Sequence, residues 1–326
     1  MTIPIDHTPA SDHLASEVEP GVFLLDHHFR GSPGVIASYL VTDGDALTLI
    51  ETGPASTMET LLAGVRQAGF DPEQIERVVV THIHLDHAGG AGALLRRLPH
   101  ARLYVHPVGA PHMIDPAKLM ASATRIYGDL MGPLWGEMLP VPKDRLSVLG
   151  NHATLSTGGR TLHAYDTPGH ANHHLALYDP ETGSVFTGDV AAVRLDGTMH
   201  IRPPTPPPEF SPEKWHASIA TLRALAPRRL YLTHFGGYDD VAWHLDEVLA
   251  RVWFWAGWVG GRLATGEDPV ATTEALRGIE DVVLARVVGD ASLVRRYEEA
   301  GNYRMSVDGI ARWWRKRGEA IATSTR

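Results

Sequence analysis

The order of hydrophobic and polar positions predicts short strands followed by helices along the first third of the chain. The runs GVFLL, VIASYLV and LTLIE between residues 21 and 50 are rich in β-branched and aromatic residues and are separated by Gly, Asp and Pro, which predicts a meander of strands. Residues 57–69 carry apolar residues at helical spacing and end at Gly69, which predicts a helix. The segment DPEQ at 71–74 then supplies an N-cap, a proline and a capping-box partner before RVVV, a predicted buried strand that leads into Thr81.

The second half of the chain repeats part of this pattern. The segment RVVVTH at 77–82 is similar to RLYLTH at 229–234, and each follows a helix-like segment, which indicates two halves with similar strand ends. Ser211 and Pro212 predict the N-cap and the first residue of a helix. The proline tract at 203–208 is typical of a stiff polyproline-type connection, and we expect it to cross the surface as a spacer.

Two other segments have helical patterns. Residues 107–142 form a helix-like insertion, for which core packing is the favoured interpretation and a pliable substrate lid the alternative. It holds half of the eight methionines, namely Met113, Met120, Met131 and Met138. From residue 241 onward, helical periodicity broken by Gly-Gly and Asp-Pro predicts about three helices, and six of the eight Trp lie there. We therefore expect a main domain over residues 1–240 and a helical C-terminal region over residues 241–326.

Composition narrows the classes of function. The chain has 326 residues, 44% of them hydrophobic, which is enough for a full core. Its net charge of −9, with no sustained basic run, argues against a nucleic-acid partner. The N-terminus lacks a secretory pattern, and nothing approaches the roughly 18 uninterrupted apolar residues of a spanning helix, so we expect a soluble, cytoplasmic protein that does not bind membranes.

The absence of cysteine and the presence of 19 His direct attention to metal chemistry, because any transition metal must then be held by imidazole and carboxylate. The segment THIHLDHAGG at 81–90 concentrates these groups. His82 and His84 project to one side at a strand end, while Asp86 and His87 follow on the next turn, so four ligating groups converge within six residues. A packing role explains this arrangement poorly, because it would leave several polar groups near a core with nothing to bind them.

The run H-x-H-x-D-H at 82–87 resembles the signature of the metallo-β-lactamase superfamily, and three later elements follow in that family's order. These are Thr167-Pro168-Gly169-His170, Thr187-Gly188-Asp189, and Thr233-His234 ahead of Gly236. The resemblance covers roughly residues 20–237. It implies an α/β fold, the αββα sandwich, in which two mixed sheets pack face to face with helices outside and the metals at one edge. The C-terminal helical region would be appended to this sandwich.

The resemblance also implies a binuclear metal centre. The first metal would be held by His82, His84 and His170, the second by Asp86, His87 and His234, and Asp189 would bridge the two. Two Zn²⁺ per chain are the favoured cofactors, with Fe or Mn as alternatives, because imidazole and carboxylate suit all three. The implied nucleophile is a metal-bridging hydroxide, with Asp86 as the group that takes and returns a proton.

Differences between this sequence and individual branches of the family narrow the range of expected substrates. True β-lactamases lack the bridging carboxylate, so Asp189 argues against that activity. Ala192 stands where N-acyl-homoserine lactonases commonly have Tyr, and the Gly-Cys-Gly segment of glyoxalase II has no match in VAAVRLDG. Glu51 occupies a place where the family usually has Asp, which predicts a slightly different environment for a ligand histidine.

Three functions compete at this point. The favoured one is a hydrolase of a small-molecule ester, thioester or lactone; the alternatives are a phosphodiesterase or nuclease of the same fold, and a metal-binding protein without turnover. His174, four residues beyond a predicted ligand, and Tyr127, in the insertion, are the predicted substrate contacts. The Trp-rich tail is expected to be a helix-packing core, although its WWRKRG end leaves a homodimer open.

Overall fold

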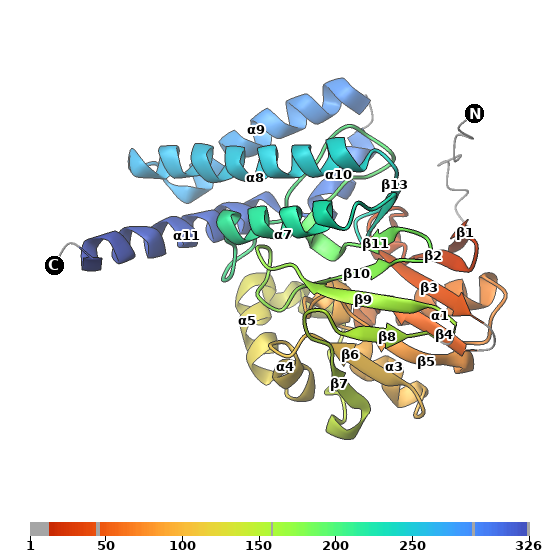
Figure 1. The fold of residues 1–326 in the computed structure, drawn as a ribbon. Coiled ribbons are helices and arrows are strands. Elements are labelled where there is room, and N and C mark those ends of the chain that lie inside the picture. Colours follow the sequence, from red (N-terminus) through yellow and green to blue (C-terminus); the bar gives the residue numbers. More distant parts are fainter. Residues whose placement is uncertain (1–12, 44–45, 158, 289–290, 325–326) are drawn as a thin grey trace.

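The computed structural model describes residues 13–43, 46–157, 159–288 and 291–324, and it contains two facing sheets between layers of helices (Figure 1). The first sheet has seven strands paired in chain order: β1 (Ala15–Glu19), β2 (Val22–Asp26), β3 (Ala37–Asp43), β4 (Ala46–Ile50), β5 (Ile75–Val79), β6 (Arg102–Val105) and β7 (Leu146–Val148). The first four strands form an antiparallel meander, and β4 to β7 run parallel. The predicted meander is therefore confirmed, with β1 as an additional strand that its polar sequence concealed.

The second sheet has six strands in the order β13-β12-β11-β10-β9-β8. They are β8 (Thr154–Ser156), β9 (Thr161–Asp166), β10 (Leu175–Asp179), β11 (Ser184–Phe186), β12 (Arg229–Leu232) and β13 (Gly236–Tyr238). Only β11 and β12 pair in parallel among these strands. Each sheet thus contains a parallel pair, β4 with β5 and β11 with β12, whose carboxyl ends deliver residues to the same region.

Helices cover both outer faces. They are α1 (Met58–Gln67), α2 (Leu85–Ala88), α3 (Ala91–Arg97), α4 (Ala110–Ile114), α5 (Ala117–Tyr127), α6 (Met131–Trp135), α7 (Pro212–Ala224), α8 (Val241–Ala264), α9 (Pro269–Val288), α10 (Ala291–Ala300) and α11 (Tyr303–Ser324). The capping signals act as predicted: Asp71 and Gln74 form a capping box at a short 3₁₀ helix, and the Ser211 side chain accepts a hydrogen bond from the Lys214 N–H at the start of α7.

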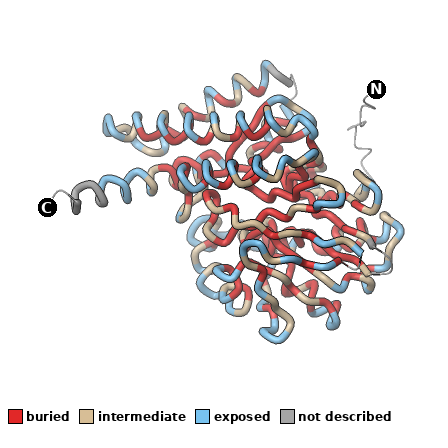
Figure 2. The backbone as a smooth tube through the Cα atoms, in the orientation of Figure 1, coloured by how far each residue is buried: buried red, intermediate tan, exposed pale blue. Residues whose placement is uncertain are grey.

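Three layers of apolar side chains hold the sandwich together. Between the sheets, residues such as Tyr39 and Val79 pack against Leu177 and Phe186. Helices α1 and α3 cover the outer face of the first sheet, and α7 and α8 cover the outer face of the second. In Figure 2 the buried backbone follows the sheets and the inner faces of these helices. The αββα architecture implied by the resemblance is confirmed.

The C-terminal region contains four helices among the described residues, α8 to α11, rather than about three. Helix α8 packs on α7, and α11 packs on both α8 and α9, so these helices continue the core of the second sheet. The end of α11 extends away from the body (Figure 1). Among the described residues, no helix has the length and apolar character needed to cross a membrane.

The proline tract is not the surface spacer that its composition predicts. Pro204 and Thr205 are buried, and Thr205 exchanges hydrogen bonds with Ser306 of α11: its N–H donates to the Ser306 hydroxyl and its own hydroxyl donates to the Ser306 carbonyl. A side chain at Gly309 of α11 would collide with the Thr205 carbonyl. The tract therefore lies between the main domain and the C-terminal helices and joins them.

A pair of Trp substitutions on α8 tests whether these helices belong to the core. Trp255 is fully buried and its indole N–H donates to Glu280 Oε1 over 3.0 Å, whereas Trp253 on the same helix is 40% exposed. We expect Trp255→Ala to lower the free energy of unfolding by about 3–5 kcal/mol and Trp253→Ala to change it by about 0.5 kcal/mol or less. Denaturant titration of both variants measures the difference, and equal effects would contradict this packing.

Candidate metal centre

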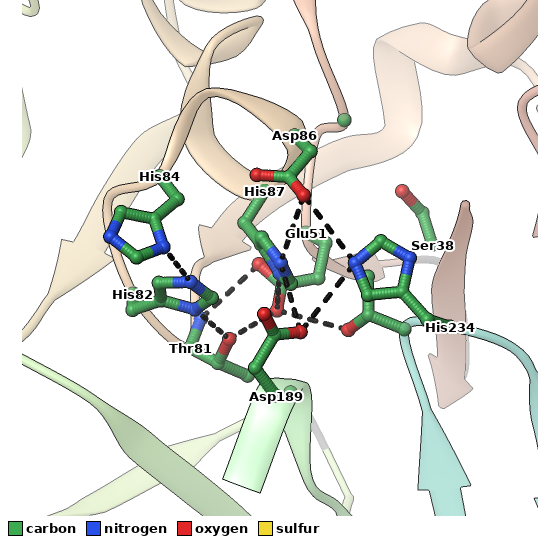
Figure 3. Close-up of polar contacts among 12 residues, drawn as sticks. Ser38, Glu51, Thr81, His82, His84, Asp86, His87, Asp189 and His234 are labelled. Atoms are coloured by element: carbon green, nitrogen blue, oxygen red, sulfur yellow. Dashed lines mark hydrogen bonds and ion pairs between the residues drawn. The ribbon is translucent and has the colours of Figure 1, made fainter. Parts of the chain in front are cut away.

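The sequence around the first histidines places them at a strand end and a helix start. Strand β5 ends at Val79, and an irregular segment with bends at Thr81 and His84 leads to α2. His84, the residue before α2, has an extended backbone. Helix α2 then turns Asp86 and His87 back toward His82, as Figure 3 shows. The four side chains of the H-x-H-x-D-H run thus lie in one region, two of them in each of two groups of potential ligands.

Two groups of potential metal ligands lie side by side. The first comprises His82, His84, His170 and Asp189, and the second comprises Asp86, His87 and His234; within each group the ligand atoms all lie within 4.8 Å of one another. The seven side chains are those that the resemblance implied. They come from the loops and short helices that follow β5, β9, β11 and β12, so both sheets supply ligands.

In the first group, two other ring nitrogens lie close to His84 Nδ1. His84 Nδ1 lies 2.9 Å from His82 Nε2 and 2.8 Å from His170 Nε2, and His170 Nε2 lies 3.2 Å from Asp189 Oδ2. Three ring nitrogens pointing at one another cannot all be satisfied by protons, since a neutral imidazole offers one donor and one acceptor. A cation at their centre would satisfy all three.

The second group faces the other oxygen of the same carboxylate. Asp189 Oδ1 lies 3.2 Å from His87 Nε2 and 3.5 Å from His234 Nε2, while Asp86 Oδ2 lies 3.4 Å from His234 Nε2. Asp189 therefore offers Oδ1 to the second group (Figure 3) and Oδ2 to His170 of the first. This is the arrangement needed for a carboxylate that bridges two cations.

Unpartnered atoms indicate that the site fits metal ions. Within the described part of the chain, His87 Nε2, His234 Nε2 and Asp189 Oδ1 are buried and make no hydrogen bond. Buried polar atoms are rarely left in this condition, because each loses its bonds to water without replacement. All three belong to the proposed ligand set, so the donors present fit a binuclear site of imidazole and carboxylate ligands.

The pKa shifts of the candidate ligand histidines also indicate a site for cations. Burial holds the pKa of His82 and His84 well below the ordinary value, with neighbouring imidazoles adding to the effect, so both rings are neutral and able to bind a cation. For His87, burial would also lower the pKa, but the carboxylates of Asp189, Asp86 and Glu51 raise it well above the ordinary value. The second group therefore attracts positive charge, which a metal ion would supply.

Glu51 orients His87 of the second group. Its Oε1 lies 3.2 Å from His87 Nδ1 and accepts a hydrogen bond from the Thr81 hydroxyl over 2.5 Å, while the Thr81 N–H donates to Oε2. A partner on Nδ1 leaves Nε2 of the ring free for a metal, which is the usual arrangement around ligand histidines. The longer carboxylate expected to alter this environment thus still reaches the histidine, from a backbone with a φ of 66°.

Backbone carbonyls orient two other ligands. His170 Nδ1 lies 2.8 Å from the Pro204 carbonyl, and His234 Nδ1 lies 2.8 Å from the Val35 carbonyl. Each contact fixes the ring and favours a proton on Nδ1, which leaves Nε2 as the metal-binding atom. The proline tract therefore helps to position the centre as well as to join the domains.

His174 does not lie at the pocket surface expected of a substrate contact. Its ring is fully buried; Nδ1 lies 2.8 Å from the Thr167 hydroxyl, and Nε2 accepts a hydrogen bond from the Asp189 N–H over 3.1 Å. The ring therefore holds the backbone that carries Asp189. A side chain at Gly188, where φ is +49°, would collide with both His174 and Thr81, which explains the Gly of the Thr-Gly-Asp element.

A pocket of about 170 Å³ opens onto the centre. It is walled by α5 and α6 of the insertion, by the proline tract and by the junction of α10 and α11. Its lining includes Asp86, Asp189, Leu119, Ser122, Ile126, Tyr127, Trp135, Pro204, Glu299, Asn302 and Met305. The predicted residue Tyr127 lies here, and its hydroxyl contacts Met305 Sδ over 3.1 Å. Burial and then the charge of Asp86 raise the pKa of Tyr127, so its hydroxyl keeps its proton.

The insertion packs on the core, as the favoured interpretation predicts, and it also borders the pocket. Met113 and Met138 are buried in the core of the first sheet, and Met120 and Met131 pack against it. The same segment nevertheless supplies one wall of the pocket. Helices α10 and α11 supply another wall, so both the insertion and the C-terminal helices shape the pocket, a point that the sequence alone leaves open.

Comparison with known proteins agrees with the fold. The family model described as the metallo-beta-lactamase superfamily matches residues 31–234, more than half of the chain. The metallo-beta-lactamase fold-containing protein ST1585 of Sulfurisphaera tokodaii is 26% identical over 223 residues, which cover 66% of this chain and 80% of that protein. A hydroxyacylglutathione hydrolase of Cupriavidus taiwanensis is 27% identical over 245 residues, covering 73% and 77%.

The structural comparison extends over the C-terminal helices. The crystal structure of the metallo-beta-lactamase family protein TTHA1429 from Thermus thermophilus superposes with a TM-score of 0.67 at 19% identity, and the match covers 93% of this chain and 95% of that one. At this identity the similarity concerns the fold. The family model, the αββα sandwich and the two groups of ligands together show that this chain belongs to the metallo-β-lactamase superfamily of metal-dependent hydrolases.

Proposed function

We propose that the protein is a binuclear metal-dependent hydrolase, with zinc as the favoured metal, that cleaves a small ester, thioester or lactone. The position of Asp189 carries this proposal, because its two oxygens face the two ligand groups separately. The bridging carboxylate also speaks against a true β-lactamase. The hydroxyacylglutathione hydrolase among the relatives supports hydrolysis of an acyl compound.

The ligand residues would hold the two cations beside the pocket. When bound, such cations activate a water molecule as nucleophile and polarise the substrate carbonyl. The protein supplies the fixed geometry. The ligand residues are held by contacts with Glu51, His174 and the backbone carbonyls of Pro204 and Val35. Pre-organised groups of this kind cost no reorganisation during the reaction.

Asp86 is the candidate for proton transfer. Its side chain lines the pocket and is 22% exposed, whereas Asp189 is only 5% exposed. Burial would raise the pKa of Asp86, but His87 and His234 lower it to about 2, so the carboxylate is ionised. Its Oδ2 contacts His234, while the pocket gives a substrate access to the carboxyl group.

Hydrolysis of a substrate panel tests the proposed reaction. After reconstitution with zinc, we expect turnover of at least one ester, thioester or lactone and little turnover of phosphodiesters. Release of acid can be followed at constant pH, with chelator-treated protein as the control. Turnover confined to phosphodiesters would assign the site to the alternative reaction, and none on any substrate would contradict the proposed function.

Metal analysis of single variants tests the ligand groups. We expect about two metal ions per reconstituted chain. His170→Ala should weaken metal binding mainly at the first site, and His234→Ala mainly at the second. Asp189→Ala should weaken both, since it serves both groups. Elemental analysis after dialysis against graded chelator measures the loss, with the exposed His216→Ala as control. Equal metal retention in all variants would show that the ligands are misassigned.

Replacement of Asp86 by Asn separates proton transfer from metal binding. Asp86→Asn keeps an oxygen able to ligate but removes the proton acceptor. We expect the turnover number to fall by about 10²-fold or more, while metal content falls much less. Parallel measurement of kcat and bound metal on the same preparations checks this expectation. A variant that binds two metals and turns over every accepted substrate at the wild-type rate would show that Asp86 is not the proton acceptor.

A further inference from the structure

One face of helix α5 borders the pocket beside the candidate metal centre. The residues of this helix that line the pocket are Leu119, Ser122, Ala123 and Ile126. Their spacing of three and four residues places them on a single face of the helix, and all but Ser122 are apolar. Because Ile126 is 47% exposed, this face presents apolar surface to solvent at the pocket.

The other walls of the pocket are also largely apolar. Trp135 borders it from α6 and Met305 from α11, and the tract at 203–208 contributes Pro204, Pro206, Pro207 and Pro208. Proline rings have no N–H group and present hydrocarbon to a ligand. A molecule that enters beside the metal centre therefore meets apolar side chains from three separate parts of the chain.

Most polar side chains of the wall already bond within the protein. The hydroxyl of Tyr127 donates to Met305 Sδ, and the Ser306 hydroxyl accepts a hydrogen bond from a backbone N–H. The side-chain amide of Asn302 donates to a carboxylate of α10 and accepts from the Met305 N–H. Ser122 of α5 is the remaining uncharged polar side chain among the described residues that line the pocket. The wall thus offers a ligand more apolar surface than free hydrogen-bonding groups.

Glu299, the charged side chain of this wall apart from the metal ligands, is turned toward the protein. Its side chain is only 7% exposed, and its Oε1 lies 3.6 Å from Arg30 and 4.0 Å from Arg295. Its Oε2 is buried from solvent. No Lys or Arg among the described residues lines the pocket. A charged ligand group away from the metal centre therefore finds no accessible partner of opposite charge on the wall.

We propose that this pocket binds an uncharged hydrocarbon chain of the substrate and that Ile126 determines the specificity for it. The inference rests on the proposed hydrolase function and names its substrate class: an ester, thioester or lactone whose carbonyl lies at the metal centre and whose chain lies along α5. Such a chain removes apolar surface from water, which raises affinity by about fourfold for each buried methylene group. A charged chain end would lose its hydration without compensation.

Ile126 and Leu130 form a matched pair of exposed apolar side chains in the insertion. They are 47% and 58% exposed, but Leu130, in the 3₁₀ helix Gly128–Leu130, does not line the pocket. Because both side chains are largely in solvent, replacement of either one by Gln should leave the melting temperature nearly unchanged. The structure assigns an effect on ligand binding to Ile126→Gln alone.

Binding of product acids provides a test that does not require turnover. Titration calorimetry of the zinc-loaded protein would compare butanoate, hexanoate and two acids of hexanoate's length that end in an ammonium or a second carboxylate. We expect hexanoate to bind about tenfold more tightly than butanoate, and more tightly than either acid with a charged end. In Ile126→Gln its advantage over butanoate should fall to about threefold or less. In Ile126→Leu and Leu130→Gln it should stay within about twofold of wild type.

Two series of esters show which half of the substrate carries the chain. In nitrophenyl esters of unbranched acids the chain lies in the acyl half, and in alkyl acetates it lies in the alcohol half. In one of the series kcat/KM should rise by about fourfold for each added methylene group until the pocket is filled. This rise should be reduced in Ile126→Gln and retained in Leu130→Gln.

Failure of this assignment and failure of the hydrolase function give different results. If the zinc-loaded protein hydrolyses esters but neither affinity nor kcat/KM depends on chain length, or if the dependence is unchanged in Ile126→Gln, the assignment of the pocket is overturned while the hydrolase function stands. Tighter binding of an acid with a charged end than of hexanoate would overturn it as well. If no ester is hydrolysed, the hydrolase function fails, and the calorimetric series decides whether the pocket binds a hydrocarbon chain.

Discussion

The structure is organised around seven candidate metal-ligating side chains in one place, of which five are buried and two, His84 and Asp86, are half-buried. Burial lowers the pKa of His82 and His84, while Asp189, Asp86 and Glu51 raise that of His87, and three of the ligand atoms are buried without a hydrogen bond. Such an arrangement is unfavourable unless a cation offsets it. The two sheets and their loops hold these side chains together despite that cost.

The support for the centre comes from segments that are far apart in the chain. Glu51 follows β4, Val35 precedes β3, and Pro204 lies in the tract before α7, yet all three contact ligand histidines. Because the carboxyl ends of β4, β5, β11 and β12 meet, short loops are enough to bring these groups within hydrogen-bond distance. The second sheet in turn relies on α7 and α8 for its outer packing.

The C-terminal helices therefore have two roles. Their buried faces complete the core over the second sheet, and the junction of α10 and α11 forms one wall of the pocket. The contact between Tyr127 and Met305 joins this wall to the insertion. A pocket built by two additions to the sandwich can change in shape and charge while the metal ligands stay in place, which is how one fold serves many substrates.

The sequence by itself determined most of the elements and the four ligating groups of the H-x-H-x-D-H run, because both depend on local signals, whereas His170, Asp189 and His234 were assigned by the family resemblance. Capping residues fixed the starts of helices, and the H-x-H-x-D-H run carries its ligands within one turn of a strand end, so their convergence needs no long-range information. Contacts across the fold decided the rest. His174 is buried behind Asp189, the proline tract lies beneath α11, and Met305 reaches the pocket from a helix more than two hundred residues beyond His84 in the sequence. No local pattern encodes these positions, since each results from how the helices pack on the sheets.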